Sequence, residues 1–159
     1  MLWNVVSIII VLAVVAADQL SKLWIRNNLV YGQSIVEIGI FRITRIHNTG
    51  AAFGLFQGQS FGLTIVAAAG AVILLVYILF VRHRYPLLDN TLSKLALGLV
   101  LGGTIGNLID RLNMGYVTDF IDIGFWPAFN VADSAITVGV FIFVYSLFPL
   151  VKKEIIASG

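Results

Sequence analysis

Two aspartates flank the short loop before the last apolar run of this chain. Asp119 lies at or just beyond the outer end of the third apolar run, and Asp133 lies just inside the fourth. The 13 residues between them form a loop that can bring the two carboxylates to the same depth. Two carboxylates in a partly dry site cannot both ionise easily, so one keeps its proton. Such a pair can deprotonate water and protonate an amide leaving group, which is the chemistry of peptide hydrolysis.

Asp133 also has a structural interpretation. Its charge would be stabilised by the dipole at the start of the fourth helix, so a capping role is a real alternative. Asn130 could cap that helix instead, which would leave Asp133 without a structural task. Asp122, close by, is expected to be a solvated loop residue.

A second polar pair lies at the end of the first apolar run. Asp18 and Lys22 are four residues apart, in the favourable order for an ion pair on a helix. A structural pair and a substrate contact are equally supported. Ser21 and Lys22 do not make a catalytic dyad, since adjacent helical residues do not face each other.

Further polar residues lie at the end of the third run and before the second. Asn107 and Arg111 share one helix face, and Asp110 is expected to pair with another helix rather than with its neighbour Arg111. A structural network is favoured for these three. Asn48 and Gly50 fit a turn, and Asn48 could also present its amide to a peptide backbone. Both interpretations stay open.

Other chemistries find no support in the sequence. Cysteine is absent, which excludes a thiolate nucleophile, a disulfide framework and a Cys-based metal site. His47 and His83 are expected on opposite sides of a membrane and form no HExxH pair, so zinc is not predicted. No GxSxG elbow, P-loop or Rossmann glycine pattern occurs. We therefore expect no cofactor and no metal.

The composition indicates what must position these residues. Of 159 residues, 59% are hydrophobic and only 11% are charged, against about 25% in a soluble domain. This excludes a soluble globular enzyme, a disordered chain and a nucleic-acid binder with a basic face. The net charge of +2 is too small to indicate an anionic partner. We predict a single integral membrane domain, residues 1–159.

Four long uncharged runs predict an all-α membrane protein with four transmembrane helices. A bilayer core needs about 20 apolar residues as helix. The predicted spans are 3–23, 61–81, 92–109 and 131–151. In the first span, Val15-Ala16-Ala17 resembles the small-residue cleavage site of a secretory signal peptide. No Lys or Arg precedes it and three more spans follow, so a retained helix is favoured. Basic residues in a short loop and a short tail place both termini in the cytoplasm.

Two local patterns refine this layout. Residues 34–46 alternate β-branched and charged residues, which predicts two short strands joined near Gly39 and a small extracytoplasmic β-sheet element. Gly98, Gly102 and Gly106 recur at a spacing of four, which lets helices approach closely.

Taken together, five motifs resemble those of lipoprotein signal peptidases, the bacterial signal peptidase II family of membrane aspartyl proteases. They occur in the family's order, and the four-span layout covers nearly the whole chain. The matching stretches are Asp18-Gln-Leu-Ser-Lys22, Asn48-Thr-Gly-Ala-Ala-Phe53, Gly102-Gly-Thr-Ile-Gly-Asn-Leu-Ile-Asp-Arg111, Val117-Thr-Asp119-Phe120 and Phe129-Asn-Val-Ala-Asp133-Ser-Ala135.

The resemblance implies that Asp119 and Asp133 are the catalytic pair. Asn48, Gly50, Asn107, Arg111 and Asn130 would bind substrate or support the site, as would Asp18, Lys22 and Asp110 of the same motifs. It further implies cleavage of prolipoproteins on the amino side of a Cys that carries diacylglycerol, without a metal, and inhibition by globomycin. The protein would be a monomer in the bacterial cytoplasmic (inner) membrane, in contact with membrane lipid and with no nucleic-acid partner, and its site would lie near the outer face.

Two structural hypotheses and two rival functions complete the expectations. The strands of 34–46 could form a platform for the substrate, and Phe53–Phe56 a lid. A small proton-coupled carrier could use the same carboxylates as a relay, but it would distribute charges across the bilayer. A non-enzymatic scaffold could use the polar residues only to hold helices together.

Overall fold

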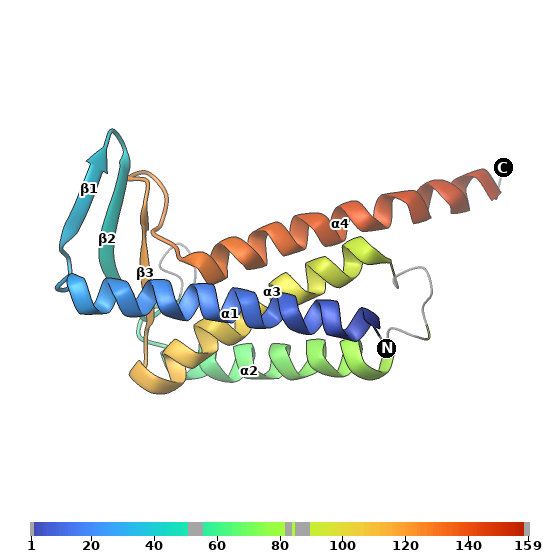
Figure 1. Ribbon diagram of the computed structural model, residues 1–159, viewed down its shortest axis with the longest axis horizontal. Helices are drawn as coiled ribbons and strands as arrows, with labels where there is room; N and C mark the ends of the chain where they lie inside the picture. Colours follow the sequence, from blue (N-terminus) through green and yellow to red (C-terminus); the bar gives the residue numbers. More distant parts are fainter. Residues whose placement is uncertain (1, 51–55, 82–83, 85–89, 158–159) are drawn as a thin grey trace.

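The protein is a bundle of four long helices with a small sheet at one end (Figure 1). The computed structural model describes residues 2–50, 56–81, 84 and 90–157, with side chains for 5–50, 56–81, 84 and 90–148. Each helix contains an apolar stretch of 18 to 24 residues, long enough to cross a membrane. The helices are α1 (Leu2–Asn28), α2 (Ser60–Val76), α3 (Thr91–Met114) and α4 (Val131–Ala157), and α2 continues into the π-helical turn η2 (Tyr77–Val81).

The helix boundaries follow local sequence signals. The predicted spans begin at residues 61, 92 and 131, and the helices begin at Ser60, Thr91 and Val131. Asn90 caps α3 by accepting a hydrogen bond from the backbone N–H of Ser93. Gly115 ends α3 in the left-handed conformation, with φ of 75°. The four-helix membrane architecture is therefore confirmed.

The glycine stripe of α3 is the surface on which α1 packs. A Cβ at Gly102 would lie 2.8 Å from Cβ of Val14, and one at Gly98 would lie 3.0 Å from a methyl group of Ile10. Only glycine permits this approach, as the spacing predicts. The close contact brings Asp18 of α1 against Gly106 of α3, so the stripe sets the depth at which polar residues of the two helices meet.

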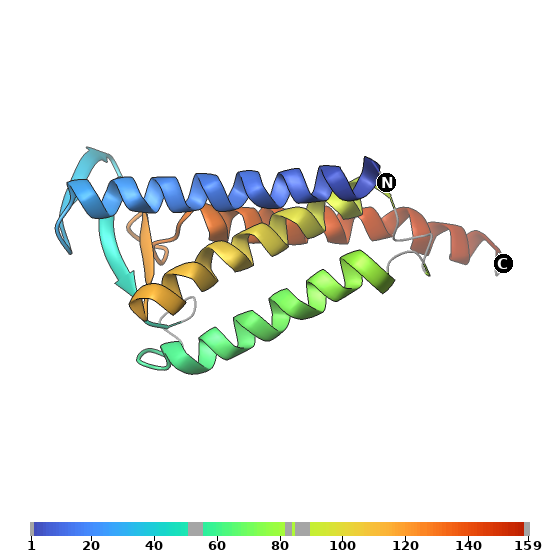
Figure 2. The ribbon, with the colours of Figure 1, turned by 60° about the horizontal axis from the view of Figure 1, so that its bottom comes forward.

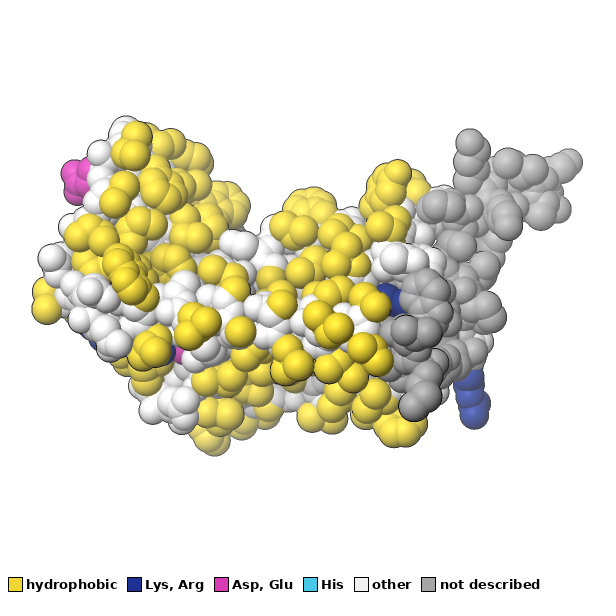
Figure 3. All heavy atoms as spheres, in the orientation of Figure 1, with side chains coloured by type: hydrophobic (Ala, Val, Ile, Leu, Met, Phe, Trp, Pro, Cys, Tyr) yellow, Lys and Arg dark blue, Asp and Glu magenta, His cyan; other side chains and the backbone are white. Residues whose placement is uncertain are grey.

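The outer surface of the bundle is apolar, as contact with lipid requires. Large apolar side chains on all four helices are more than half exposed, among them Ile9, Ile73, Leu112 and Phe141. Hydrophobic side chains cover much of the bundle's flank in Figure 3. The charged residues Asp18 and Lys22 of α1 are instead completely buried.

The sheet has three antiparallel strands in the order β1 (Ser34–Ile38), β2 (Phe41–Asn48) and β3 (Val117–Asp122). The hairpin expected in residues 34–46 is confirmed, and Gly39 makes its turn with φ of 60°. The third strand was not expected. It follows α3 directly and pairs with β2, Asp119 opposite Ile46.

The third strand corrects one expectation. Asp122 is not a solvated loop residue but the last residue of β3, opposite Arg42 of β2. Its carboxylate lies 2.7 Å from the Arg42 guanidinium. The strand pairing creates this ion pair, and nothing local in the sequence indicates it.

The sheet lies across the end of the bundle where α1 ends and α4 begins (Figure 1). Arg45 of β2 fixes it there by donating hydrogen bonds to the carbonyl oxygens of Arg26, at 3.0 Å, and Leu29, at 2.8 Å. These carbonyls at the end of α1 have no partner within the helix. The start of α1 and the end of α4 both lie at the opposite end, where α4 extends beyond the other helices (Figures 1 and 2).

Candidate active site

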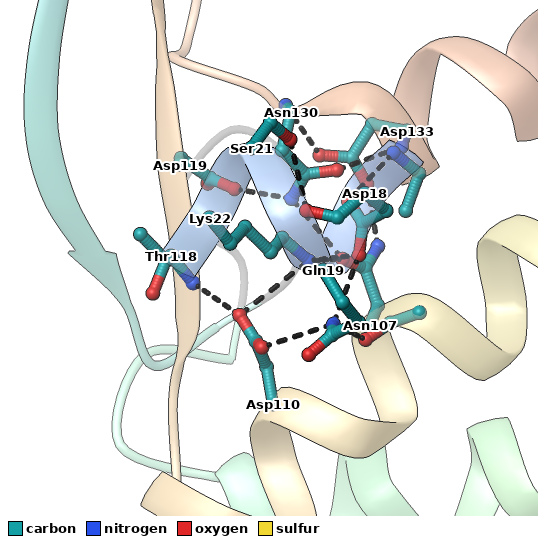
Figure 4. A network of polar contacts seen from close by, with 12 residues as sticks. Asp18, Gln19, Ser21, Lys22, Asn107, Asp110, Thr118, Asp119, Asn130 and Asp133 are labelled. Atoms are coloured by element: carbon teal, nitrogen blue, oxygen red, sulfur yellow. Dashed lines mark hydrogen bonds and ion pairs between the residues drawn. The ribbon is translucent and has the colours of Figure 1, made fainter. Parts of the chain in front are cut away.

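Polar side chains from five elements converge beneath the sheet (Figure 4). Helix α1 supplies Asp18 and Lys22, α3 supplies Asn107 and Asp110, and β3 supplies Asp119. Asn130 and Asp133 come from the start of α4, and Asn48 from the end of β2. Residues up to 114 positions apart in sequence are thus joined by hydrogen bonds.

Asp119 is almost completely buried, with 1% of its surface exposed. One carboxylate oxygen accepts a 2.7 Å hydrogen bond from the side-chain amide of Asn130, and the other accepts a 2.9 Å bond from that of Asn48. Burial, and then the nearby charge of Asp133, raise the pKa of Asp119 to about 7, although both amide hydrogen bonds oppose this shift. Asp119 can therefore exchange a proton near neutral pH.

Asp133 and Asn130 form a reciprocal cap at the start of α4. The backbone N–H of Asp133 donates to the Asn130 side chain at 2.9 Å, and the backbone N–H of Asn130 donates to the Asp133 carboxylate at 3.2 Å. The two capping interpretations are therefore not alternatives. The expectation that capping by Asn130 leaves Asp133 without a structural task is wrong, because Asp133 completes the cap.

Asn107 and Asn130 connect the two carboxylates. The side-chain nitrogen of Asn107 donates to the second Asp133 oxygen at 2.8 Å. Its oxygen accepts from the side-chain nitrogen of Asn130 at 3.1 Å, and that same nitrogen reaches Asp119. One chain of hydrogen bonds thus runs from Asp133 to Asp119.

Asp18, Lys22 and Asp110 form the buried base of this network. The Lys22 ammonium lies 2.8 Å from Asp18 and 3.4 Å from Asp110. The other oxygen of Asp18 accepts the backbone N–H of Ala132 at 3.0 Å. The Asp110 oxygen that faces Lys22 also accepts the backbone N–H of Thr118 at 2.9 Å. The expected ion pair of Asp18 with Lys22, and the pairing of Asp110 with another helix, are confirmed. These contacts hold α1 against the start of α4 and β3.

Two residues of α1 join this base without having been anticipated. Arg26 lies 3.2 Å from Asp110, and its guanidinium donates to the Thr118 hydroxyl at 3.3 Å. Gln19 donates to the carbonyl oxygen of Gly106 at 3.0 Å. A sequence signal existed for Arg26, since Asp18, Lys22 and Arg26 recur at a spacing of four and so share one helix face.

Asn48 forms the predicted turn and also contacts Asp119. Its side-chain oxygen accepts the backbone N–H of Gly50 at 2.9 Å, while its nitrogen donates to Asp119. In this structure the amide therefore faces a carboxylate. The guanidinium of Arg111 contacts the same turn, donating a hydrogen bond to the carbonyl oxygen of Gly50 at 3.2 Å. The rest of this motif, residues 51–53, lies outside the described residues, as does most of the expected lid at 53–56.

A cavity of about 340 Å³ opens beside this network. Asp133, Asn107, Arg111 and Asn48 form its polar wall. Asp119 does not border the cavity and lies behind Asn48 and Asn130, to which it is bonded. The apolar wall comes from the loop before α4 and from nearby strand and helix residues, namely Val117, Trp126, Pro127, Ala128, Phe129 and Ile136.

Within the described part of the chain, no three His, Asp or Glu side chains are grouped so that they could hold a metal ion. His47 lies in β2, with its ring stacked on Tyr116 at a centroid distance of 3.9 Å. His83 lies outside the described residues, so the placement of the two histidines on opposite sides of a membrane stays a prediction.

Comparisons with known proteins agree with the geometry. A family profile described as "Signal peptidase (SPase) II" matches residues 10–149. A lipoprotein signal peptidase of Dehalococcoides mccartyi is 53% identical over 126 residues, 79% of this chain and 78% of that protein. One of Moorella thermoacetica is 44% identical over 141 residues, 88% of this chain and 91% of that protein.

Solved structures give the same result. A bacterial membrane enzyme solved at 2.3 Å resolution matches with a TM-score of 0.78 and 31% identity, covering 94% of this chain and 89% of the other. A second, solved at 1.9 Å, matches with a TM-score of 0.76 and 32% identity, covering 90% and 92% of the two chains. The resemblance found in the five motifs is thus confirmed. The chain belongs to the signal peptidase II family, the membrane peptidases that remove signal peptides from lipoproteins.

Proposed function

We propose that this protein is an aspartyl endopeptidase that uses Asp119 and Asp133 to activate water. Its substrate is a prolipoprotein whose signal peptide is cut on the amino side of a Cys that carries diacylglycerol. The observation that carries the proposal is the pair of carboxylates joined through Asn130, one of which borders a cavity at the end of the bundle.

The reaction needs one ionised and one protonated carboxylate. The ionised one takes a proton from water as the water oxygen bonds to the carbonyl carbon of the scissile peptide. The protonated one gives its proton to the amide nitrogen as the carbon–nitrogen bond breaks. A pKa of about 7 for Asp119 supports this scheme, because such a carboxyl group can both hold and release a proton at neutral pH. Either aspartate can begin in either role.

The surrounding amides act as positioning groups in this proposal. Asn107 and Asn130 hold the two carboxylates at fixed orientations through bonds of 2.7 to 2.8 Å. Asn107 and Arg111 also border the cavity and are placed to contact the substrate. Asp18, Lys22 and Asp110 are assigned to support of the site, since none of them lines the cavity. They contact each other, backbone N–H groups and the side chains of Arg26 and Asn107.

The position of the site suits a substrate anchored in lipid. We place the sheet end of the bundle at the outer face of the cytoplasmic membrane and both termini in the cytoplasm. A lipid-anchored protein would then meet the cavity at the membrane surface, with the strands of residues 34–48 as its platform. Residues 51–55, where the lid hypothesis falls, are outside the described part of the chain.

No observation favours a proton-coupled carrier. A relay needs carboxylates at several depths of the bilayer. In the four apolar stretches long enough to cross a membrane, the acidic residues are Asp18, Asp110 and Asp133, which all gather beneath the sheet (Figure 4).

The proposed activity is tested with purified protein and two substrates, a diacylglyceryl-modified prolipoprotein and the same prolipoprotein without lipid. We expect cleavage of the lipidated form alone, with the lipidated Cys as the new N-terminus by mass spectrometry, and inhibition by globomycin. Equal cleavage of both forms, or a cut at another bond, would contradict the proposal.

A further inference from the structure

A second cavity of about 270 Å³ lies between α2, α3 and α4. Three of its lining residues, Asn107, Arg111 and Ile136, also line the first cavity. The two cavities therefore diverge from a common point beside Asp133. The other residues that line the second one are Leu63, Val66, Ala67 and Thr104.

The second cavity changes from polar to apolar along α3. Thr104, Asn107 and Arg111 follow one another on one helix face over about 10 Å, at 1.5 Å per residue. Arg111 and Asn107 make the end near the sheet polar. Thr104 lies at the other end of the cavity, and its hydroxyl already donates a 2.7 Å hydrogen bond to the carbonyl oxygen of Val100. This end therefore offers a ligand no free hydrogen-bond donor from Thr104.

The opposite wall is the apolar face of α2 formed by Leu63, Val66 and Ala67. Helix α2 makes its main helix contact with α3 and lies on the side of α3 away from α1 (Figure 2). Val66 is 69% exposed, so this wall continues into the lipid-facing surface of the bundle. A chain of methylene groups could therefore pass from the bilayer into the cavity.

We propose that the second cavity binds the acyl chains on the substrate's Cys, while the first cavity binds the peptide. This inference rests on the proposed function. The lipid is attached to the side chain next to the scissile bond, so peptide and lipid must separate within a few ångströms of the aspartates. The two cavities separate at that point.

Arg111 provides the polar contact at the branch. Its Nε is buried and has no hydrogen-bond partner among the described residues. The glyceryl ester oxygens, at the polar end of the lipid, would accept this donor. The acyl chains then lie against Ala67, whose small side chain leaves the space open.

The test is a comparison of acyl-chain lengths. Lipopeptide substrates with two palmitoyl or two butyryl chains are cleaved by wild type, Ala67→Phe and Ala67→Leu in the same detergent. A bulky residue at position 67 fills the cavity, so the ratio of kcat/KM for the long-chain to the short-chain substrate should fall about tenfold or more in Ala67→Phe, and less in Ala67→Leu. Ala69→Phe is the matched control on the exposed side of α2, and its ratio should equal that of wild type.

An unchanged ratio in Ala67→Phe would overturn the inference. Equal loss on both substrates, in Ala67→Phe and in the milder Ala67→Leu, would also overturn it and would assign the cavity to the signal peptide. Failure of the proposed function is distinguishable, because wild type would then cleave neither lipopeptide.

Discussion

The ammonium group of Lys22 donates a 2.9 Å hydrogen bond to the side-chain oxygen of Asn107. A lysine can only donate, so this contact fixes which end of the Asn107 amide faces it. The amide nitrogen is then directed at Asp133, 2.8 Å away. A buried cation at the base of the network thus orients the group that holds a carboxylate in the cavity wall.

Replacing Lys22 by methionine should strongly destabilise the fold. Lys22 and Asp18 are both completely buried, and the change leaves the Asp18 carboxylate without its cation. Breaking a buried pair in this way costs about 3–5 kcal/mol. Unfolding in detergent micelles measures the effect. Arg42→Met is the control, since it breaks a pair with Asp122 in which the arginine is 42% exposed, and such pairs contribute about 1 kcal/mol or less. Equal losses in the two variants would contradict this account.

The pH profile of cleavage should report the titration of the aspartate pair. Because the pKa of Asp119 is about 7, a plot of log kcat/KM against pH should change slope near pH 7. This inflection reports the titration of the two interacting aspartates together and not of Asp119 alone. The Asn48 amide stabilises the ionised form of Asp119, so Asn48→Leu should move the inflection to higher pH. Asn28→Leu, at an exposed amide of α1, should leave the profile unchanged. A shift to lower pH in Asn48→Leu would refute the assignment.

Replacing Asp119 by asparagine should change the stability of the fold in a pH-dependent way. The pKa of Asp119 rises from 3.8 to about 7 on folding, so the folded protein binds more protons than the unfolded chain between these values. The contribution of Asp119 to the free energy of unfolding is therefore full below about pH 4 and is lost as pH rises through 7. The melting temperature of Asp119→Asn relative to wild type should increase from pH 5 to pH 8. A constant difference would contradict the raised pKa.

Replacing Gly106 by alanine should disturb the contact between α1 and α3. A Cβ at this position would lie 2.5 Å from Oδ2 of Asp18, the oxygen that pairs with Lys22. Because the other oxygen accepts the backbone N–H of Ala132, this carboxylate cannot easily move. Overpacking of this kind costs about 1–3 kcal/mol. Gly70→Ala on α2 is the control, because nothing lies within 4 Å of its added methyl group. In thermal unfolding, Gly106→Ala should melt at a lower temperature than Gly70→Ala. Equal melting temperatures would contradict this, because they would mean that α1 and α3 can move apart to accept the methyl group without cost.

The helices could be predicted because their signal is local. Apolar runs locate α2, α3 and α4 to within one residue of their starts. The predicted end of the third span at residue 109 is early, because α3 continues through Asp110 and Arg111 to Met114. The buried Asp110 is compatible with this helix because Lys22 and Arg26 of α1 pair with its carboxylate.

The third strand could not be predicted, since its partner is about seventy residues away in sequence. Val117–Asp122 becomes a strand by pairing with β2, and this also brings Asp119 to Asn48. The sequence predicted Asp119 and Asp133 at one depth, and its motifs named Asn107 and Asn130 as site residues, but it could not reveal that hydrogen bonds of these amides connect the two carboxylates. Those contacts depend on how α3, β3 and α4 pack together.

The most direct test of the central claim is a gel-shift cleavage assay with a diacylglyceryl-modified prolipoprotein and single Asp→Asn variants. General acid–base groups contribute about 10²–10⁴-fold to rate, so Asp119→Asn and Asp133→Asn should each lose cleavage by at least that factor. Both should remain folded, and in Asp133→Asn the asparagine oxygen can still accept the backbone N–H of Asn130. Asp122→Asn, in the same strand but paired with Arg42, should cleave like wild type. Normal cleavage by either Asp119→Asn or Asp133→Asn would contradict the proposed mechanism, and loss of the folded state in both would favour a purely structural role for these carboxylates.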